Sequence, residues 1–130
     1  MLFLDYFPDN CPPRIAQPAS GRVYYLVKND PPTPEDFFAK RQKNPRRRFS
    51  NNEQECRACG ISVYTEIEDI LNIRRIYPGL ENLKVAVGDL IPNFGVIQHT
   101  SSTNSPSHHT LWLAVGAEVW TVFQVINMTQ

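Results

Sequence analysis

"GISVYTEIEDILNIRRIYPG", the stretch at residues 60–79, changes its hydrophobic period partway along. Residues 61–64 are mostly β-branched or aromatic, which is typical of a short strand. Beyond them, the positions that share one face follow a helical spacing and are Ile67, Ile70, Leu71 and Arg74. This spacing indicates a helix with one face packed inward. A strand followed at once by an amphipathic helix is therefore the unit from which we predict the fold.

Both ends of this helix carry boundary signals. Thr65 and Glu68 match the T-x-x-E capping box, in which a hydroxyl and a carboxylate satisfy backbone amides at the start of a helix. Tyr77-Pro78-Gly79 ends the element, because proline and glycine do not continue a helix. We therefore expect the helix to be capped by Thr65 and to stop at this tripeptide.

The same order of elements occurs once before in the chain. "RVYYLVK", residues 22–28, is rich in β-branched and aromatic side chains and is predicted to be the first strand. Two prolines then stop this strand. Thr33 is a candidate N-cap, Pro34 suits the first helical position, and Asp36 at N3 completes an approximate capping box. A short helix from Pro34 to about Arg41 is expected.

The second half of the chain is rich in strand-forming residues. "LKVAVGDL", residues 83–90, alternates in a way that predicts a strand with one buried face. Three further β-rich runs follow, at residues 94–100, 108–115 and 117–126. The sequence therefore predicts an α+β fold with a curved, mostly antiparallel β-sheet and two short helices in the N-terminal half.

The 130 residues have the length and composition of a single domain, with 42% hydrophobic and 20% charged residues. Residues 1–21 hold four prolines, which predict an irregular lead-in pinned to the domain by its aromatic side chains. Residues 22–130 form the α+β domain. A basic and polar loop is expected at about residues 40–55, "KRQKNPRRRFSNNEQE".

The overall charge and the cysteine count narrow the class of protein. Thirteen basic and thirteen acidic residues cancel, so no global field points to nucleic acid or to a membrane. No run approaches the roughly eighteen apolar residues that a membrane span needs. The opening MLFLDYF lacks the basic start of a signal peptide, and three cysteines, an odd number, argue against a disulfide framework. A cytoplasmic protein of bacterial type is expected.

The basic run inside the polar loop allows two interpretations. The favoured one is a solvated loop in which Arg46, Arg47 and Arg48 point into water. The alternative is a patch for phosphate, RNA or an acidic partner. Only Phe49 could stack on a base there, so nucleic-acid binding through this run is weakly indicated.

Cys56 and Cys59 have the spacing of a tight metal-binding turn. Two thiolates at this spacing can hold zinc, with Cys11 or a histidine as a further ligand. The sequence lacks the second tight pair that structural zinc sites usually carry. Two small buried cysteines are therefore the favoured interpretation, and zinc is the alternative.

Two adjacent histidines begin the run at residues 108–115. In a strand they point to opposite faces, so His108 shares a face with Thr110 and Trp112. An imidazole, a hydroxyl and an indole in a row could hold a planar polar ligand. The competing interpretation places His108 at the solvated end of the strand and Trp112 in the core.

The blocks "YYLVKNDPPTPEDF", "GISVYTEIEDI" and "HHTLWL", with "YPGL" before the last, resemble a group of small uncharacterised bacterial proteins. The resemblance covers roughly residues 22–126. These proteins in turn resemble the ADP-ribosyltransferase fold, a compact split β-sheet with two helices that cradles NAD. The resemblance implies NAD as the cofactor, although the last strands here carry no obvious catalytic glutamate.

The resemblance also implies roles for individual residues. Arg22 would bind a pyrophosphate, because a guanidinium clasps phosphate oxygens in a bidentate manner. Ser62 and Tyr64 would shape the nicotinamide pocket. His108 or Thr110 would lie near the reacting ribose.

Three functional classes are therefore open. The first, which the sequence favours, is a binding or interaction module with one polar pocket and a protein partner. The second is an NAD-using, ADP-ribosyltransferase-like or toxin-like enzyme with Ser62 and His108 as catalytic residues. The third is a zinc protein built on Cys56 and Cys59. No nucleophile elbow, P-loop, dinucleotide fingerprint or H-E-x-x-H motif decides between them.

Overall fold

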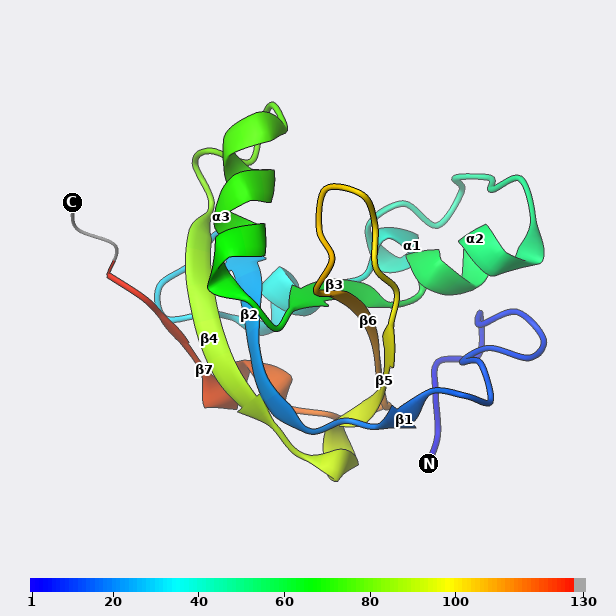
Figure 1. The fold of residues 1–130 in the computed structure, drawn as a ribbon. Coiled ribbons are helices and arrows are strands. Elements are labelled where there is room, and N and C mark those ends of the chain that lie inside the picture. The colour runs from blue at the N-terminus through cyan, green and yellow to red at the C-terminus, as the bar shows by residue number, and fades with distance from the viewer. Residues whose placement is uncertain (128–130) are drawn as a thin grey trace.

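Seven strands form one antiparallel sheet in the computed structural model, which describes residues 1–127 (Figure 1). Their order across the sheet is β1-β5-β6-β3-β2-β4-β7, and the sheet is not closed. The strands are β1 (Gln17–Pro18), β2 (Gly21–Val27), β3 (Ile61–Tyr64), β4 (Lys84–Leu90), β5 (Gly95–His99), β6 (His108–Leu113) and β7 (Phe123–Val125). The predicted α+β class and the antiparallel sheet are confirmed.

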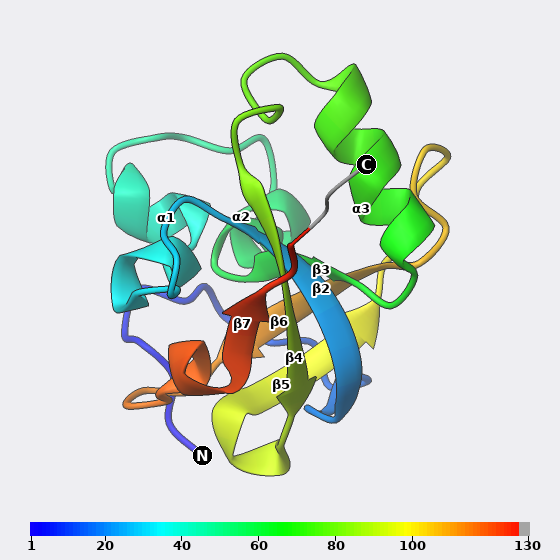
Figure 2. The same cartoon turned by 90° about the vertical axis from the view of Figure 1, so that its left-hand side faces the viewer.

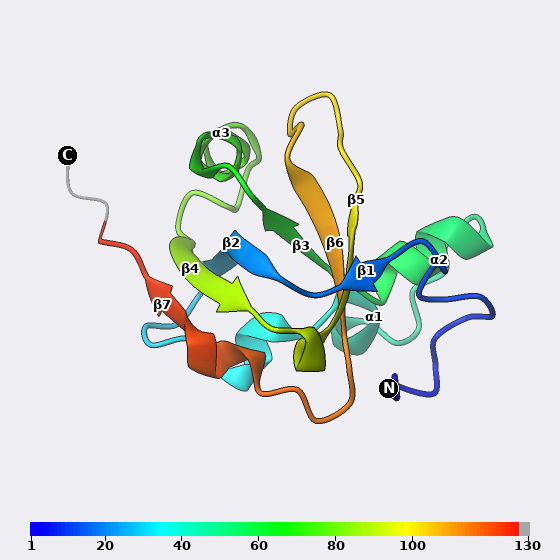
Figure 3. The same cartoon turned by 60° about the horizontal axis from the view of Figure 1, so that its bottom comes forward.

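Three α-helices and three 3₁₀ turns complete the described chain. The helices are α1 (Lys40–Lys43), α2 (Asn52–Ala58) and α3 (Ile67–Ile76), and the 3₁₀ turns are Pro34–Phe37, Pro92–Phe94 and Val119–Val122. Figures 1 and 3 show α3 beyond one end of β3, with α1 and α2 beyond the other. None of the helices in residues 1–127 has the length and apolar character needed to cross a membrane.

The sheet consists of two halves that meet at one residue pair. β3 pairs along its whole length with β6, from Ile61–Leu111 to Tyr64–His108. With β2 it shares only the pair Tyr24–Tyr64. The halves β1-β5-β6-β3 and β2-β4-β7 therefore diverge from this point, and the strands bend strongly around the core (Figures 1 and 2).

Strand β4 is buried on both faces, so the prediction of a one-faced strand is wrong. Val85 packs with Tyr64 and Ile70 beneath α3. Its neighbour Ala86 points the other way, into the main core, and is equally buried. Alternation in the sequence suggested a solvated face because the residues on that side are small. They are small because neighbouring elements pack closely against this side of β4. The ring of Phe123 on β7, for example, lies directly against Gly88.

The helix expected from Pro34 to about Arg41 is two separate pieces. The 3₁₀ turn ends at Phe37, and Phe38 and Ala39 are extended before α1 begins. The break follows from what Asp36 binds. Its backbone carbonyl accepts the Tyr25 hydroxyl at 2.6 Å, and its carboxylate accepts backbone N–H groups of Thr33 and Lys28. A carbonyl turned toward a tyrosine does not continue the helical hydrogen-bond ladder.

The capping box predicted for α3 at Thr65 is also wrong. Glu66, not Thr65, occupies the N-cap position, and no side chain of its own caps the helix. Ser107 takes that role from the loop before β6, because its hydroxyl accepts the Glu66 N–H at 3.1 Å. In return, the Asp69 carboxylate accepts the Ser107 N–H at 2.8 Å.

The loop expected at about residues 40–55 contains more structure than its composition indicated. Asn51 caps α2, because its side-chain oxygen accepts the Gln54 N–H at 2.9 Å. Arg41 is buried, forms an ion pair with Glu55 and donates to the Pro45 carbonyl at 2.7 Å. A buried, paired arginine holds the segment between α1 and α2 against the domain.

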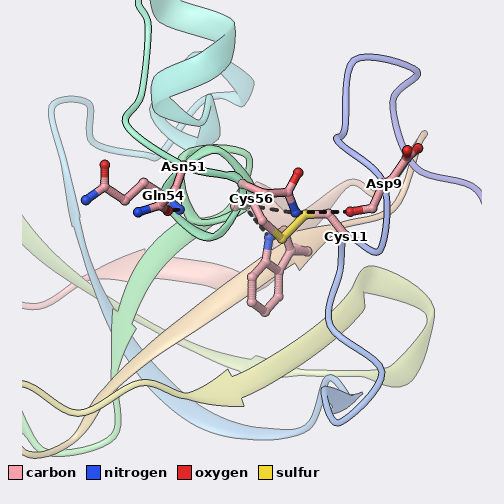
Figure 4. Close-up of a disulfide and its surroundings, with 7 residues drawn as sticks. Asp9, Cys11, Asn51, Gln54 and Cys56 are labelled. Carbon is pink, nitrogen blue, oxygen red and sulfur yellow. Dashed lines mark hydrogen bonds between the residues drawn. A yellow bond between two sulfur atoms is a disulfide. The ribbon is translucent and has the colours of Figure 1, made fainter.

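A disulfide bond joins Cys11 to Cys56, with the two Cα atoms 5.6 Å apart (Figure 4). The argument from an odd cysteine count was therefore wrong, since Cys59 is the unpaired one. The bond ties the N-terminal lead-in to α2. Beside it, Asn52 donates to the Asp9 carbonyl at 3.2 Å, and the Trp112 indole donates to the Cys56 carbonyl at 2.8 Å.

Removal of the disulfide should lower the free energy of unfolding by about 4 kcal/mol, because the bond closes a long loop in the unfolded chain. The double variant Cys11→Ala/Cys56→Ala tests this in urea denaturation. As a control, a reducing agent should destabilise the native protein by a similar amount and leave the double variant unchanged. Equal stability of the native protein with and without reductant would contradict the assignment.

The two capping residues can be compared directly. Ser107→Ala should lower the free energy of unfolding by about 1 kcal/mol, because the Glu66 N–H loses its acceptor. Thr65→Ala, the matched control, should change it by less than about 0.5 kcal/mol, as at other exposed positions. Urea denaturation of both variants measures the difference. If Thr65→Ala lowered the free energy of unfolding more than Ser107→Ala, the result would support the capping box at Thr65.

Candidate functional site

A cavity of about 680 Å³ lies where β2 and β3 diverge. Residues from β2, β3 and β6 line it, together with the segment from Phe38 to Arg57 on one side and residues that follow or belong to α3 on the other. This volume falls within the range typical of small-molecule sites. The split in the sheet therefore coincides with a cavity of this size.

The floor of the cavity is built by the pairing of β3 with β6. Ser62 lies opposite Thr110, and Tyr64 lies opposite His108. Since side chains alternate along a strand, these four share one face, and all four line the cavity. The structure thus brings together four of the residues that the sequence singled out.

His108 is held at both ring nitrogens. Its Nε2 lies 2.8 Å from the Ser62 hydroxyl. Its Nδ1 lies 2.9 Å from the Thr100 backbone carbonyl and 2.9 Å from the Thr100 hydroxyl. A carbonyl oxygen can only accept, so Nδ1 carries the proton and donates it to Thr100. In the neutral ring, Nε2 then has a free lone pair and accepts the proton of Ser62.

The surroundings of His108 favour the neutral imidazole. Burial lowers its pKa, and the nearby Arg57, His109 and His99 side chains lower it further. The hydrogen bond to the Thr100 carbonyl opposes this shift in part. Tyr64 stands edge-on to His108, with ring centroids 5.3 Å apart, and burial raises the pKa of its phenol to about 12. Both groups are therefore uncharged at neutral pH.

The cavity lining carries four strong cations and no carboxylate among the described residues. Lys40 and Lys43 come from α1, Arg47 from the following loop and Arg57 from α2. The chain as a whole has equal numbers of acidic and basic residues, so this is a local segregation of charge. A cavity lined by one sign of charge concentrates ions of the opposite sign.

Sequence reasoning missed three of these cations and one hydrogen-bonding residue. Composition predicts a solvated loop around Lys40 and Lys43, and Arg57 carries no motif of its own between the two cysteines. The spacing of Lys40 and Lys43, three residues apart, was the available signal, because it places both on one helix face. Thr100 had no such signal, since it meets His108 only through the β5–β6 hairpin.

Two predicted ligand-binding residues lie elsewhere. Arg22 is exposed at the start of β2, with its Nε 3.2 Å from an Asp89 carboxylate oxygen on β4. It is not part of the cavity lining. Trp112 shares the face of His108, but α2 covers it, and its side chain is only 1% exposed. It is a core residue, as the competing interpretation proposed.

The zinc site that was the alternative interpretation of Cys56 and Cys59 is not formed. The sulfur of Cys56 is bonded to Cys11 and is not available as a thiolate. Cys59 is buried, and burial together with the Glu55 carboxylate raises the pKa of its thiol to about 11. Within residues 1–127, no three His, Cys, Asp or Glu side chains are grouped as a metal site requires.

The arginine run divides in the structure. Arg46, Arg47 and Arg48 are all exposed, as the solvated interpretation predicted. Arg47 differs in lining the cavity, with its guanidinium 5.0 Å from the centre of the Phe49 ring. Arg46 and Arg48 therefore lie on the surface outside the cavity lining, whereas Arg47 is part of that lining.

Comparison of the chain with protein-family models, curated proteins and solved structures gives no match. The resemblance to small bacterial proteins and to the ADP-ribosyltransferase fold therefore stays a prediction.

The stability of the domain should fall as the pH drops below about 6.5, the ordinary pKa of histidine in an unfolded chain. The folded state holds His108 with a lowered pKa, so the unfolded chain takes up its proton first. This contribution is complete above the unfolded pKa and is lost as the pH falls through the folded one. Urea denaturation at pH 7.5 and pH 5 measures it.

His108→Gln should reduce that pH dependence. The glutamine keeps a polar side chain beside Ser62 and does not titrate. If the variant and the native protein lose the same free energy of unfolding between the two pH values, His108 is not the responsible group.

Proposed function

We propose that this domain binds a small anionic ligand that carries phosphate, in the cavity between β2 and β3. The observation that carries the proposal is the lining itself, in which four cations meet no carboxylate among the described residues. Guanidinium and ammonium groups are the usual protein partners of phosphate oxygens. The proposed role belongs to the binding-module class that the sequence favoured, with a small molecule as the ligand in place of the protein partner expected there.

The cations of the cavity are not neutralised by ion pairs within residues 1–127. The ion pairs of the described chain are Arg22–Asp89 and Arg41–Glu55, and neither involves a lining cation. Like charges placed together destabilise a fold unless a counter-ion meets them. Binding of an anion therefore relieves the repulsion among Lys40, Lys43 and Arg57 and stabilises the fold.

The rest of the cavity wall suits a ring system attached to that phosphate. Phe38 is 40% exposed, so its ring is accessible to a ligand. It lines the cavity together with Phe49, while Leu80 and Leu83 form apolar wall near α3. Aromatic and apolar walls with a few polar groups are the ordinary composition of a cofactor or nucleotide site. A nucleotide-like molecule therefore matches both parts of the cavity.

A second candidate is the NAD-using, ADP-ribosyltransferase-like enzyme that the resemblance implies. Ser62, Tyr64 and His108 line one cavity, and the cations there suit the pyrophosphate of NAD. The sheet, joined by one residue pair, is compatible with the split sheet of that fold. Without a carboxylate in the described lining to support ribosyl transfer, this candidate ranks second.

The disulfide indicates the kind of cellular compartment in which the protein is found. Disulfide bonds persist in oxidising compartments and are rare in the cytoplasm. The Cys11–Cys56 bond thus favours an oxidising compartment over the cytoplasm that the sequence indicated.

Titration calorimetry with pyrophosphate, ADP, ADP-ribose and NAD tests the proposal, with adenosine as the uncharged control. Each phosphate-bearing molecule should bind more tightly at 50 mM than at 300 mM salt, and adenosine should bind at least about tenfold more weakly, a difference of about 1.4 kcal/mol. Tight binding of adenosine, or no heat with any of the four anions, would contradict it. Tight binding of NAD with release of nicotinamide would promote the second candidate.

Charge reversal at the site should weaken ADP binding. Arg57→Glu and Lys43→Glu should each raise the dissociation constant by about tenfold or more, because each replaces an attraction by a repulsion. Arg14→Glu is the matched control, since Arg14 is an exposed arginine of the lead-in outside the cavity lining. The same loss in all three variants would point to net charge and not to this site.

A further inference from the structure

We infer that Ser62 and His108 form a nucleophile–base pair that hydrolyses a carboxylic ester whose acyl part carries an anionic group. The pair itself follows from the hydrogen bonds on the floor of the cavity. The anionic substrate class rests on the proposed function, because it uses the same cations.

The geometry has the three parts that an activated nucleophile requires. The Ser62 hydroxyl lies 2.8 Å from His108 Nε2, within the range for proton transfer. The Thr100 carbonyl, 2.9 Å from Nδ1, fixes the ring orientation and the tautomer. Nucleophile, base and orienting group in this relation are the general arrangement for covalent catalysis by serine. Ser62 is exposed at the cavity, so a substrate can reach it.

Thr100 forms side-chain hydrogen bonds in addition to its backbone hydrogen bond with β6. The Thr100 hydroxyl meets both His108 Nδ1 and the Thr110 hydroxyl at 2.9 Å. Thr100 and Thr110 are both buried, so these bonds are protected from water. The imidazole is therefore held in one orientation before any substrate binds, which is the preorganisation that a catalytic base needs.

The reaction balances without a cofactor or an oxidant. Ser62 Oγ bonds to the acyl carbon while its proton passes to His108 Nε2, and the ester oxygen leaves as an alcohol that takes this proton. Water then attacks the acyl–Ser62 intermediate and passes one proton to His108, which returns it to Ser62 Oγ. The products are a carboxylic acid and an alcohol.

Arg57 supplies the charge that such a reaction needs. It lines the cavity, and its positive charge acts on His108. A cation in the same cavity as the reacting serine stabilises the oxyanion that forms when the carbonyl carbon becomes tetrahedral. Lys40 and Lys43 remain available for the anionic group of the substrate.

Covalent labelling tests the pair. The protein is treated with a fluorophosphonate probe, and the modified residue is located by peptide mass spectrometry. A single adduct on Ser62 is expected. Ser62→Ala should abolish it, and His108→Gln should slow it by about 100-fold or more. Ser101→Ala, which changes an exposed serine outside the cavity lining, should label at the native rate.

Two further measurements guard against unfolded variants and separate the claims. Circular dichroism must show native spectra for the compared variants, and Ser62→Cys should still be acylated by an activated ester if the base is functional. Absence of a Ser62 adduct, or labelling that is indifferent to His108→Gln, would overturn the nucleophile–base pair. Calorimetry with ADP on the same sample reports the proposed function independently of this result.

The substrate class has its own test. Mono-p-nitrophenyl succinate carries an anionic acyl group, and p-nitrophenyl acetate does not. The native protein should hydrolyse the succinate ester with a kcat/KM at least about tenfold higher, and 300 mM salt should reduce this preference. Equal kcat/KM values for the two esters would overturn the anionic class.

Discussion

One residue pair, Tyr24 with Tyr64, makes the strand pairing that joins the two halves of the sheet. Beyond this pair, β3 continues to pair with β6 and no longer pairs with β2, so the two halves of the sheet separate. The cavity lies in the space between them. Gly60 shows how closely β3 approaches β6 at its start. A Cβ on this residue would lie 2.6 Å from Thr110 Cγ2, so the buried threonine would have to shift to make room for it. The position of the cavity therefore depends on how β3 divides its pairing between two neighbours.

Helix α2 connects the disulfide with the chemistry of the site. Cys56 fixes the helix to the lead-in, and its carbonyl is held by the Trp112 indole from β6. The next residue, Arg57, points to the cavity. Arg57, the cation closest in sequence to the cross-link, thus also acts on His108, whose pKa is lowered by burial and by this charge. Helix α2 therefore carries both a cysteine of the disulfide and a cation of the cavity.

The floor of the cavity gains its order from buried hydroxyl and carbonyl groups. A histidine bonded only to water would exchange freely between tautomers, whereas the Thr100 carbonyl selects one. That selection directs the lone pair of His108 toward Ser62. The cations at the cavity wall act at longer range on whatever enters. Orientation at the floor and attraction at the wall are therefore separate properties of one site.

The sequence by itself determined the features that depend on neighbouring residues. Periodicity placed the strand at 61–64 and the helix after it, and alternation placed His108 and Thr110 on one face. The tertiary structure decided what other segments contribute, namely the Ser107 cap, the Cys11–Cys56 bond and the cations that line the cavity with Ser62. Local patterns report backbone geometry, because it repeats every two or four residues. Glu66 and Ser107 are 41 positions apart and Cys11 and Cys56 are 45 apart, so these pairs leave no such period and only the folded chain brings them together.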